Sequence, residues 1–309
     1  MHGGVRYMPC LGLLLGVTLL FCGCASQADA GKKEAPETVR ETVTELLLPK
    51  AEGQVTDGNE SVSIDASHTE EGYVMVRWEG GDARVRVQIQ LPGGDTSTYV
   101  LETGAYQVFP LTGGDGLYRV DVLENAYGDM YALSFSQELS VSLRDEFRPY
   151  LYPNQYAWYD EGSRTVALGR ELSAQSADDL DYVDRVYAYV TENVVYDTVA
   201  AQNISTNYIP QADVTLSTKK GICFDYASLA TALLRSQGIP TRLEVGYSGT
   251  AYHAWISVYL EESGWVDRVI EFNGDSWNLL DPTLAASNDR KSVEKYIGDG
   301  RNYTVKYFY

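Results

Sequence analysis

Cysteine, histidine and basic residues are scarce in this sequence of 309 residues. It has four cysteines and three histidines, and its 24 lysines and arginines face 43 aspartates and glutamates, a formal net charge of −19. With so few basic side chains, the protein has little basic surface that could neutralise the phosphates of DNA or RNA. No nucleic acid is therefore expected as a partner. An acidic surface also resists adhesion to anionic lipid, so any attachment to a membrane needs a separate device.

A long hydrophobic run is missing as well. The apolar run from Leu11 to Phe21 has 11 residues, too few to span a bilayer as a mature helix, and Arg6 precedes it as in a signal peptide. Residues 20–24, Leu-Phe-Cys-Gly-Cys, resemble a bacterial lipoprotein signal. This resemblance implies a signal peptide over 1–24, lipidation at Cys24 and export to the outer face of the bacterial cytoplasmic membrane or to the cell surface. The alternative is an ordinary secretory peptide cleaved after Ala25 or nearby.

The cysteines then divide by position. Cys10 and Cys22 belong to the predicted signal peptide and Cys24 to the lipid anchor, which leaves Cys223 as the single free thiol of an exported protein. No intramolecular disulfide is then possible. Cys223 is either a buried inert residue or a reactive thiol.

The first half of the chain lacks helical periodicity. Residues 25–58 are polar and predict a flexible tether. From 59 to 145, about seven short alternating runs separated by glycine-rich turns predict an antiparallel β-sandwich of immunoglobulin-like type. In one such run Val85, Val87 and Ile89 share a face. His68 lies in a polar loop and is expected to be solvated, and the sandwich could act as a spacer or bind a partner.

The second half, 146–309, alternates helical and strand patterns and predicts an α+β domain. A junction over 145–158 leads to an amphipathic helix of about five turns with Ser176 as N-cap. Residues 198–218 predict a surface loop. A second helix begins at Cys223 and ends before Gly238, and strands follow over 241–247, over 253–259 and before Pro282.

Three residue types in this domain suit nucleophilic catalysis. Cys223 lies in the first turn of a predicted helix, where free backbone amides and the helix dipole favour a thiolate and suit an oxyanion. His253 opens a strand and Asp281 ends one, so they could serve as base and as the group that orients the base.

Four motifs in order carry a family resemblance. They are Gly-x-Cys-x-Asp-Tyr-Ala at 221–227, Gly-Ile-Pro-Thr-Arg at 238–242, His-Ala-Trp at 253–255 and Trp-x-Leu-Leu-Asp-Pro-Thr at 277–283. Together they resemble the transglutaminase-like superfamily of papain-like folds over about 147–309. The resemblance implies Cys223 as nucleophile, His253 as base and Asp281 as orienter. The side chain completing the oxyanion hole is not identified; a residue between Asn203 and Gln211 is a guess.

The leading hypothesis is an exported, membrane-anchored cysteine amidohydrolase or peptidase. It would act through a thioester acyl-enzyme on peptide or protein substrates, including cell-wall peptides. The alternatives are a protein-glutamine acyltransferase that cross-links proteins and a non-catalytic binding or scaffold module. No cofactor or metal is expected, because no acidic loop has EF-hand spacing and Asp178, Asp179 and Asp181 fit a solvated helix face.

Overall fold

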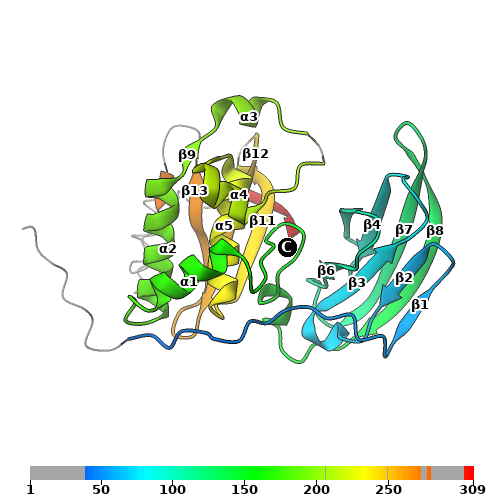
Figure 1. Ribbon diagram of the computed structural model, residues 1–309, viewed down its shortest axis with the longest axis horizontal. Coiled ribbons are helices and arrows are strands. Elements are labelled where there is room, and N and C mark those ends of the chain that lie inside the picture. Colours follow the sequence, from blue (N-terminus) through cyan, green and yellow to red (C-terminus); the bar gives the residue numbers. More distant parts are fainter. Residues whose placement is uncertain (1–38, 206, 249, 273–276, 280–302) are drawn as a thin grey trace, which may run out of the picture. The chain divides into compact units, whose positions relative to one another are not determined.

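The computed structural model describes residues 39–309 except for 206, 249, 273–276 and 280–302 (Figure 1). The chain divides into two compact units, Met1–Ala35 and Pro36–Tyr309, and every described residue belongs to the second. The predicted signal peptide, the lipidation site Cys24 and the candidate orienter Asp281 lie outside the described residues. No helix among the described residues is long and apolar enough to cross a membrane.

Two antiparallel four-stranded sheets form the first half of the described chain. One has the order β1-β2-β3-β6 and the other β5-β4-β7-β8. Their strands are β1 (Thr56–Gly58), β2 (Val62–Asp65), β3 (Tyr73–Trp78), β4 (Val85–Gln90), β5 (Thr96–Leu101), β6 (Gln107–Pro110), β7 (Gly116–Tyr127) and β8 (Met130–Val141).

The core of these sheets follows from their alternation. Val85, Val87 and Ile89 are all buried, while the residues between them are partly exposed, so the predicted inward face is confirmed. Trp78 of the other sheet is buried in the same hydrophobic core. The prediction of antiparallel strands is therefore confirmed, and the immunoglobulin-like type stays a prediction.

A mixed α+β arrangement forms the second half. A five-stranded antiparallel sheet has the order β14-β13-β12-β11-β15, and a separate pair, β9 and β10, is parallel. The elements are α1 (Arg164–Ser173), α2 (Asp179–Asn193), β9 (Val195–Tyr196), α3 (Thr198–Gln202), α4 (Ala212–Thr218), β10 (Lys220–Gly221), α5 (Cys223–Ser236), β11 (Thr241–Ser248), β12 (Ala251–Leu260), β13 (Gly264–Phe272), β14 (Trp277–Leu279) and β15 (Tyr303–Phe308).

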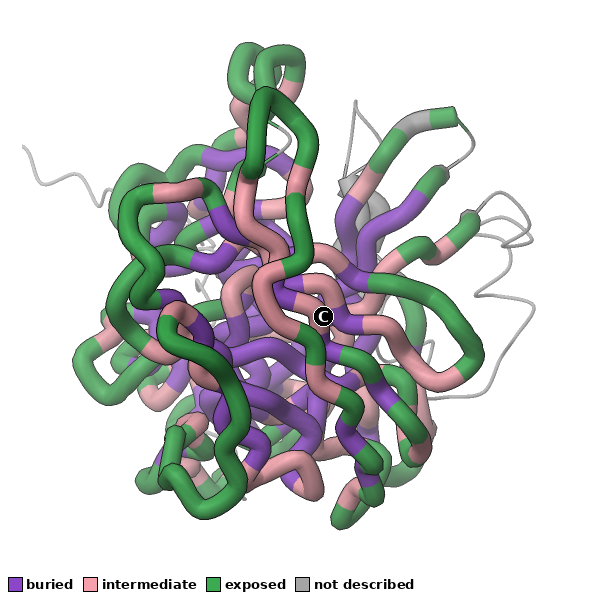
Figure 2. The backbone as a smooth tube through the Cα atoms, turned by 90° about the vertical axis from the view of Figure 1, so that its right-hand side faces the viewer, coloured by how far each residue is buried: buried purple, intermediate pink, exposed green. Residues whose placement is uncertain are grey.

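Helix α5 is the centre of this half. It packs on β11, β12 and β13 and also contacts α1, α2 and α4, and every residue from Asp225 to Ser236 is buried. Figure 2 shows the buried backbone gathered in the interior. A helix that is apolar on nearly all sides is stable only when other elements cover both of its faces, here the sheet on one and the helices on the other. Any face left exposed would lose the free energy gained by burying its hydrophobic surface.

Two local predictions differ from the structure. The N-cap of α2 is Asp178, whose carboxylate accepts the Asp181 N–H at 2.8 Å, whereas Ser176 donates its hydroxyl to the Leu172 carbonyl. The segment 198–218 predicted as a loop contains α3 and α4. Both helices are shorter than a periodicity window, so the sequence pattern could not reveal them.

The described part of the predicted tether is held in place. Arg40 donates to Asp179 at 2.6 Å, to the Ser173 hydroxyl at 2.9 Å and to the Gln237 carbonyl at 2.6 Å, and Leu46 is buried. These contacts fix residues 39–46 to the helical half through hydrogen bonds and burial. This portion therefore differs from the flexible tether expected over 25–58.

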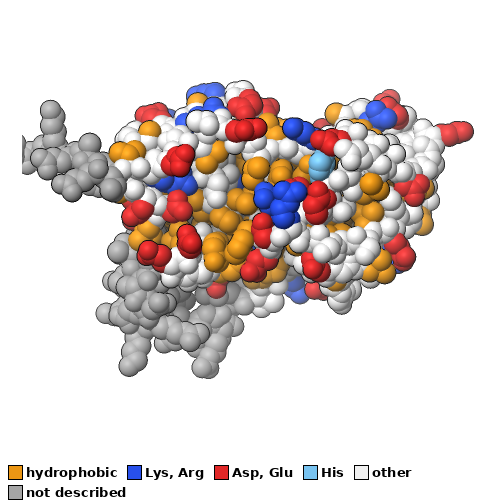
Figure 3. All heavy atoms as spheres, turned by 90° about the horizontal axis from the view of Figure 1, so that it is seen from below, with side chains coloured by type: hydrophobic (Ala, Val, Ile, Leu, Met, Phe, Trp, Pro, Cys, Tyr) orange, Lys and Arg blue, Asp and Glu red, His pale blue; other side chains and the backbone are white. Residues whose placement is uncertain are grey.

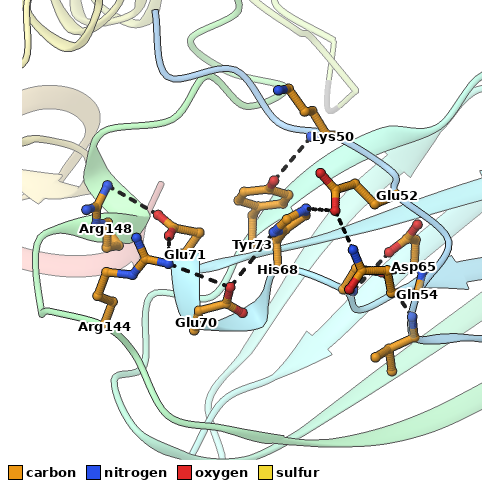
Figure 4. Close-up of polar contacts among 12 residues, drawn as sticks. Lys50, Glu52, Gln54, Asp65, His68, Glu70, Glu71, Tyr73, Arg144 and Arg148 are labelled. Carbon is orange, nitrogen blue, oxygen red and sulfur yellow. Dashed lines mark hydrogen bonds and ion pairs between the residues drawn. The ribbon is translucent and has the colours of Figure 1, made fainter.

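The same segment continues along the sheets, as Figure 4 shows. The backbone N–H of Lys50 donates to the Tyr73 hydroxyl at 3.1 Å, and a Glu52 oxygen lies 3.4 Å from Nε2 of His68. His68 also lies 3.8 Å from Glu70, and its side chain is only 22% exposed. The histidine expected to be solvated is instead part of a contact between this segment and the strands.

Arg235 joins several elements at the far end of α5. This fully buried side chain donates to the carbonyls of Tyr152 at 2.8 Å, Thr241 at 2.6 Å and Tyr309 at 2.6 Å. Burial lowers the pKa of Arg235 to about 10. Three carbonyls therefore satisfy a charge that would be costly to bury alone, and they tie the junction, β11 and the residue after β15 to α5.

Candidate active site

Cys223 is the first residue of α5, as predicted. The Ile222 N–H that precedes it donates to the Asp225 carboxylate at 2.8 Å, and the other Asp225 oxygen accepts the Tyr208 hydroxyl at 2.6 Å. A Cβ on Gly221 would meet Asp225 at 2.6 Å, so the small residue is required there. Burial raises the pKa of Asp225, while the bonds from Tyr208 and Ile222 lower it. This set fixes the first turn that carries the thiol.

The thiol lies against strand β12. Burial raises the pKa of Cys223, and the backbone N–H groups of Ala254 and Phe224 act in the opposite direction by hydrogen bonding the sulfur. This direction differs from the lowered pKa predicted from the helix N-terminus alone. Desolvation of this partly buried thiol outweighs the amides and the dipole.

His253 directly precedes the residue that contacts the thiol. It lies on β12 opposite Gly246 of β11 and is partly buried. The structure therefore brings Cys223 to the backbone next to His253. Asp281 follows β14 by two residues and lies outside the described residues.

Tyr196 is a residue that the sequence reading missed. Its hydroxyl hydrogen bonds both the thiol and the backbone N–H of Cys223, and burial raises the pKa of Tyr196 to about 12. The parallel pairing of β9 with β10 places it there, because Tyr196 is opposite Gly221 and the Asp197 N–H donates to the Gly221 carbonyl at 2.8 Å. A two-residue strand leaves no periodic signal, so only the lone tyrosine after α2 could have hinted at it.

That a residue between Asn203 and Gln211 completes the oxyanion hole stays a prediction. Tyr208 within this segment holds Asp225 and contacts the site indirectly. Tyr196 is a described side chain whose hydroxyl lies at the backbone N–H of Cys223, where it could donate to an oxyanion.

A buried carboxylate lies behind the histidine strand. Glu244 of β11 is 4% exposed and accepts the Trp255 indole N–H at 2.5 Å. Burial raises the pKa of Glu244, and the bond from Trp255 lowers it. The tryptophan of the His-Ala-Trp motif is thereby fixed two residues from His253 on the same strand.

Among the described residues, no group of histidine, cysteine, aspartate and glutamate side chains is arranged to hold a metal ion. The described site thus consists of a thiol at a helix N-terminus, two backbone amides and a tyrosine hydroxyl. These groups suit attack on a carbonyl carbon and stabilisation of the oxyanion that results.

The family comparison decides what kind of domain carries this site. Residues 166–268 match the model of the transglutaminase-like superfamily. The chain carries a transglutaminase-like domain. The match includes Cys223 and His253 and ends before Asp281.

Two curated relatives are themselves uncharacterised. The chain is 28% identical over 149 residues to the uncharacterized protein YebA of Bacillus subtilis, covering 41% of this chain and 20% of YebA. It is 26% identical over 178 residues to the uncharacterized protein ML0607 of Mycobacterium leprae, covering 56% of this chain and 57% of ML0607. The chain therefore spans only part of the length of both relatives.

Solved structures show distant likeness. A proposed cysteine protease from Cytophaga hutchinsonii shares 15% identity at a TM-score of 0.38, covering 77% of this chain and 83% of that one. Red sea bream transglutaminase shares 14% identity at a TM-score of 0.25, covering 70% and 48%. At these scores the likenesses carry no argument about the chemistry of this transglutaminase-like domain.

Proposed function

We propose that this chain is an exported cysteine amidohydrolase or peptidase, anchored by a lipid at Cys24 to the outer face of the bacterial cytoplasmic membrane. Cys223 is the nucleophile, His253 the general base and Asp281 the group that orients His253. The substrates are amides of peptides or proteins, including cell-wall peptides. Nucleic acid is not a partner, because the chain carries a net charge of −19.

The observation that carries this proposal is the surroundings of the thiol. Cys223 begins a buried helix, contacts the Ala254 N–H next to His253 and hydrogen bonds the Tyr196 hydroxyl. An inert structural cysteine needs none of these partners. The match of residues 166–268 to the transglutaminase-like superfamily supports the same chemistry.

The raised pKa of Cys223 favours a concerted first step. The neutral thiol attacks the amide carbonyl carbon while His253 takes its proton, and the new oxyanion accepts hydrogen bonds from the Cys223 N–H and the Tyr196 hydroxyl. The imidazolium then gives its proton to the departing amine, and a thioester remains on the sulfur. Water attacks the thioester with His253 again as base, which releases the acid and restores the thiol.

Hydrolysis of fluorescently labelled casein and of purified cell-wall peptides tests the proposal, using residues 25–309. We expect release of new amino groups, loss of this activity in Cys223→Ala, and a fall in kcat of about 10- to 100-fold in Tyr196→Phe with little change in KM. Dansylcadaverine is added in parallel. Its thiol-dependent incorporation in place of hydrolysis would make the chain an acyltransferase, and substrate binding without turnover would make it a binding module.

A further inference from the structure

A cavity of about 730 Å³ lies where the sheet half meets the transglutaminase-like half. Glu102 and Tyr106 line it beyond the end of β5, Trp158 and Asp160 line it ahead of α1, and Asp213 lines it from α4. Both halves of the described chain thus contribute walls. A cavity of this size can hold several residues of a peptide.

The charge of this cavity is unbalanced. Glu102, Asp160 and Asp213 line it, and none of the described residues that line it is basic. Asp213 accepts bonds from the backbone N–H groups of Arg164 at 2.9 Å and Thr165 at 2.8 Å, so neutral donors fix its carboxylate without cancelling its charge.

Two arginines lie just outside the lining, and neither removes this imbalance. Arg77 is 3.4 Å from Glu79, its own counter-ion, and the Arg164 guanidinium donates to the Ser217 hydroxyl at 2.5 Å. Arg77 is therefore paired with a carboxylate of its own, whereas three carboxylates belong to the lining itself. The cavity keeps a negative potential that favours a cation.

Trp158 adds an aromatic surface to this negative potential. Its side chain is 47% exposed although it is large and apolar. The Tyr106 ring already carries the Arg77 guanidinium at 4.9 Å, whereas the structure describes no cation over Trp158. A tryptophan face beside carboxylates attracts an ammonium or guanidinium group.

Two residues that line the cavity are each next in sequence to a residue that contacts helix α5. Ile209 follows Tyr208, whose hydroxyl holds Asp225 in the first turn of α5. Gln155 precedes Tyr156, whose ring centre lies 5.3 Å from that of Phe224, the residue after the nucleophile. The lining of the cavity is therefore continuous in sequence with the residues that contact the first turn of α5, the helix that begins at Cys223.

We propose that this cavity is a subsite for a lysine or arginine side chain of the peptide substrate, with Glu102 and Trp158 as the recognising groups. This inference rests on the proposed function, because it assumes a peptide substrate at Cys223. It gives the sheet half a part in substrate selection, since Glu102 belongs to that half.

The test is a binding titration in the Cys223→Ala variant of residues 25–309, so turnover plays no part. The probe is acetyl-Ala-Lys-Lys-Ala-amide, and the uncharged probe replaces both lysines by norleucine. The readout is the ¹⁵N-indole resonance of Trp158, assigned by its absence in Trp158→Phe. We expect the lysine peptide to shift this resonance and the norleucine peptide to bind at least about fivefold more weakly.

Acidic side chains are dispersed across the surface as well (Figure 3), so diffuse attraction needs its own control. Glu102→Gln should weaken binding by about two- to fivefold, whereas Glu60→Gln, the same charge change at an exposed position outside the cavity, should leave it unchanged. Equal effects of the two variants, equal affinity for both peptides, or an unmoved Trp158 resonance would overturn the subsite. Peptide binding without thiol-dependent hydrolysis in the unmodified protein would overturn the proposed function instead.

Discussion

At the thiol of Cys223, burial and hydrogen bonding act in opposite directions. Burial raises the pKa, and the amides of Ala254 and Phe224 lower it by a smaller amount. The protonated thiol is neutral and the thiolate is charged, so desolvation favours the thiol. The fraction of Cys223 present as thiolate at pH 7 is therefore lower than that of an ordinary cysteine. The helix N-terminus alone suggests the reverse.

This balance predicts the pH dependence of alkylation. In residues 25–309 Cys223 is the only thiol, and its iodoacetamide labelling rate should rise with pH to a midpoint above the ordinary value of about 8.5. His253→Ala should leave the labelling rate at pH 7 nearly unchanged. Fast labelling that persists below pH 7 and disappears in His253→Ala would instead establish a preformed thiolate–imidazolium pair.

Among the elements, β11 is constrained where it faces the histidine. Gly246 is opposite His253 on one side, and on the other it pairs with β15 next to an irregularity in register. A Cβ at Gly246 would lie 2.1 Å from the Thr304 carbonyl oxygen. No side-chain rotation can relieve this contact, because the oxygen belongs to the backbone and the backbone of residue 246 fixes where its Cβ lies.

Gly246→Ala should therefore destabilise the fold by about 2–3 kcal/mol and displace the His253 strand. Urea unfolding measures the first effect and activity at a permissive temperature the second. Gly162→Ala is the matched control, because its Cβ would meet its nearest neighbour at an ordinary 3.4 Å. Equal stability of the two variants would show that β15 can move away from Gly246.

Elements differed in how well the sequence predicted them. The helix from Cys223 was predictable because apolar residues and Gly238, with its φ of +80°, mark its body and its end. The pair β9 and β10 was not, since two residues per strand carry no period and their pairing is a tertiary event. Tyr196 depends on that pairing, so the sequence could place Cys223 at the start of a helix but could not place the Tyr196 hydroxyl beside it.

At the scale of the whole molecule, the described residues include a large hydrophobic core that runs through both the sheet half and the transglutaminase-like half. Tyr99 of β5 packs on Tyr156 with ring centres 5.8 Å apart, and Gln155 bonds both the N–H and the carbonyl of Val100 at 3.2 and 2.6 Å. The sequence predicted two domains from the change of periodicity, but periodicity reports local structure and says nothing of how much surface the halves share.

Such a shared core predicts cooperative unfolding. Differential scanning calorimetry of residues 25–309 should show one transition, with equal calorimetric and van't Hoff enthalpies. Arg235→Met should lower that single transition, because it removes hydrogen bonds from three buried carbonyls in different segments. Two separate transitions, with only one shifted in Arg235→Met, would show that the halves unfold independently.

The fixation of Arg40 also sets a working distance. If the lipid is at Cys24, as proposed, the connection from the lipid to the first fixed residue, Arg40, is 40 − 24 = 16 residues long. A tether that ended at Gly58 would be 58 − 24 = 34 residues long. Sixteen residues span at most about 55 Å when fully extended. If the proposed anchor and activity hold, the domain would therefore reach only a shallow layer above the membrane, and bonds deeper in the envelope would be protected by distance alone.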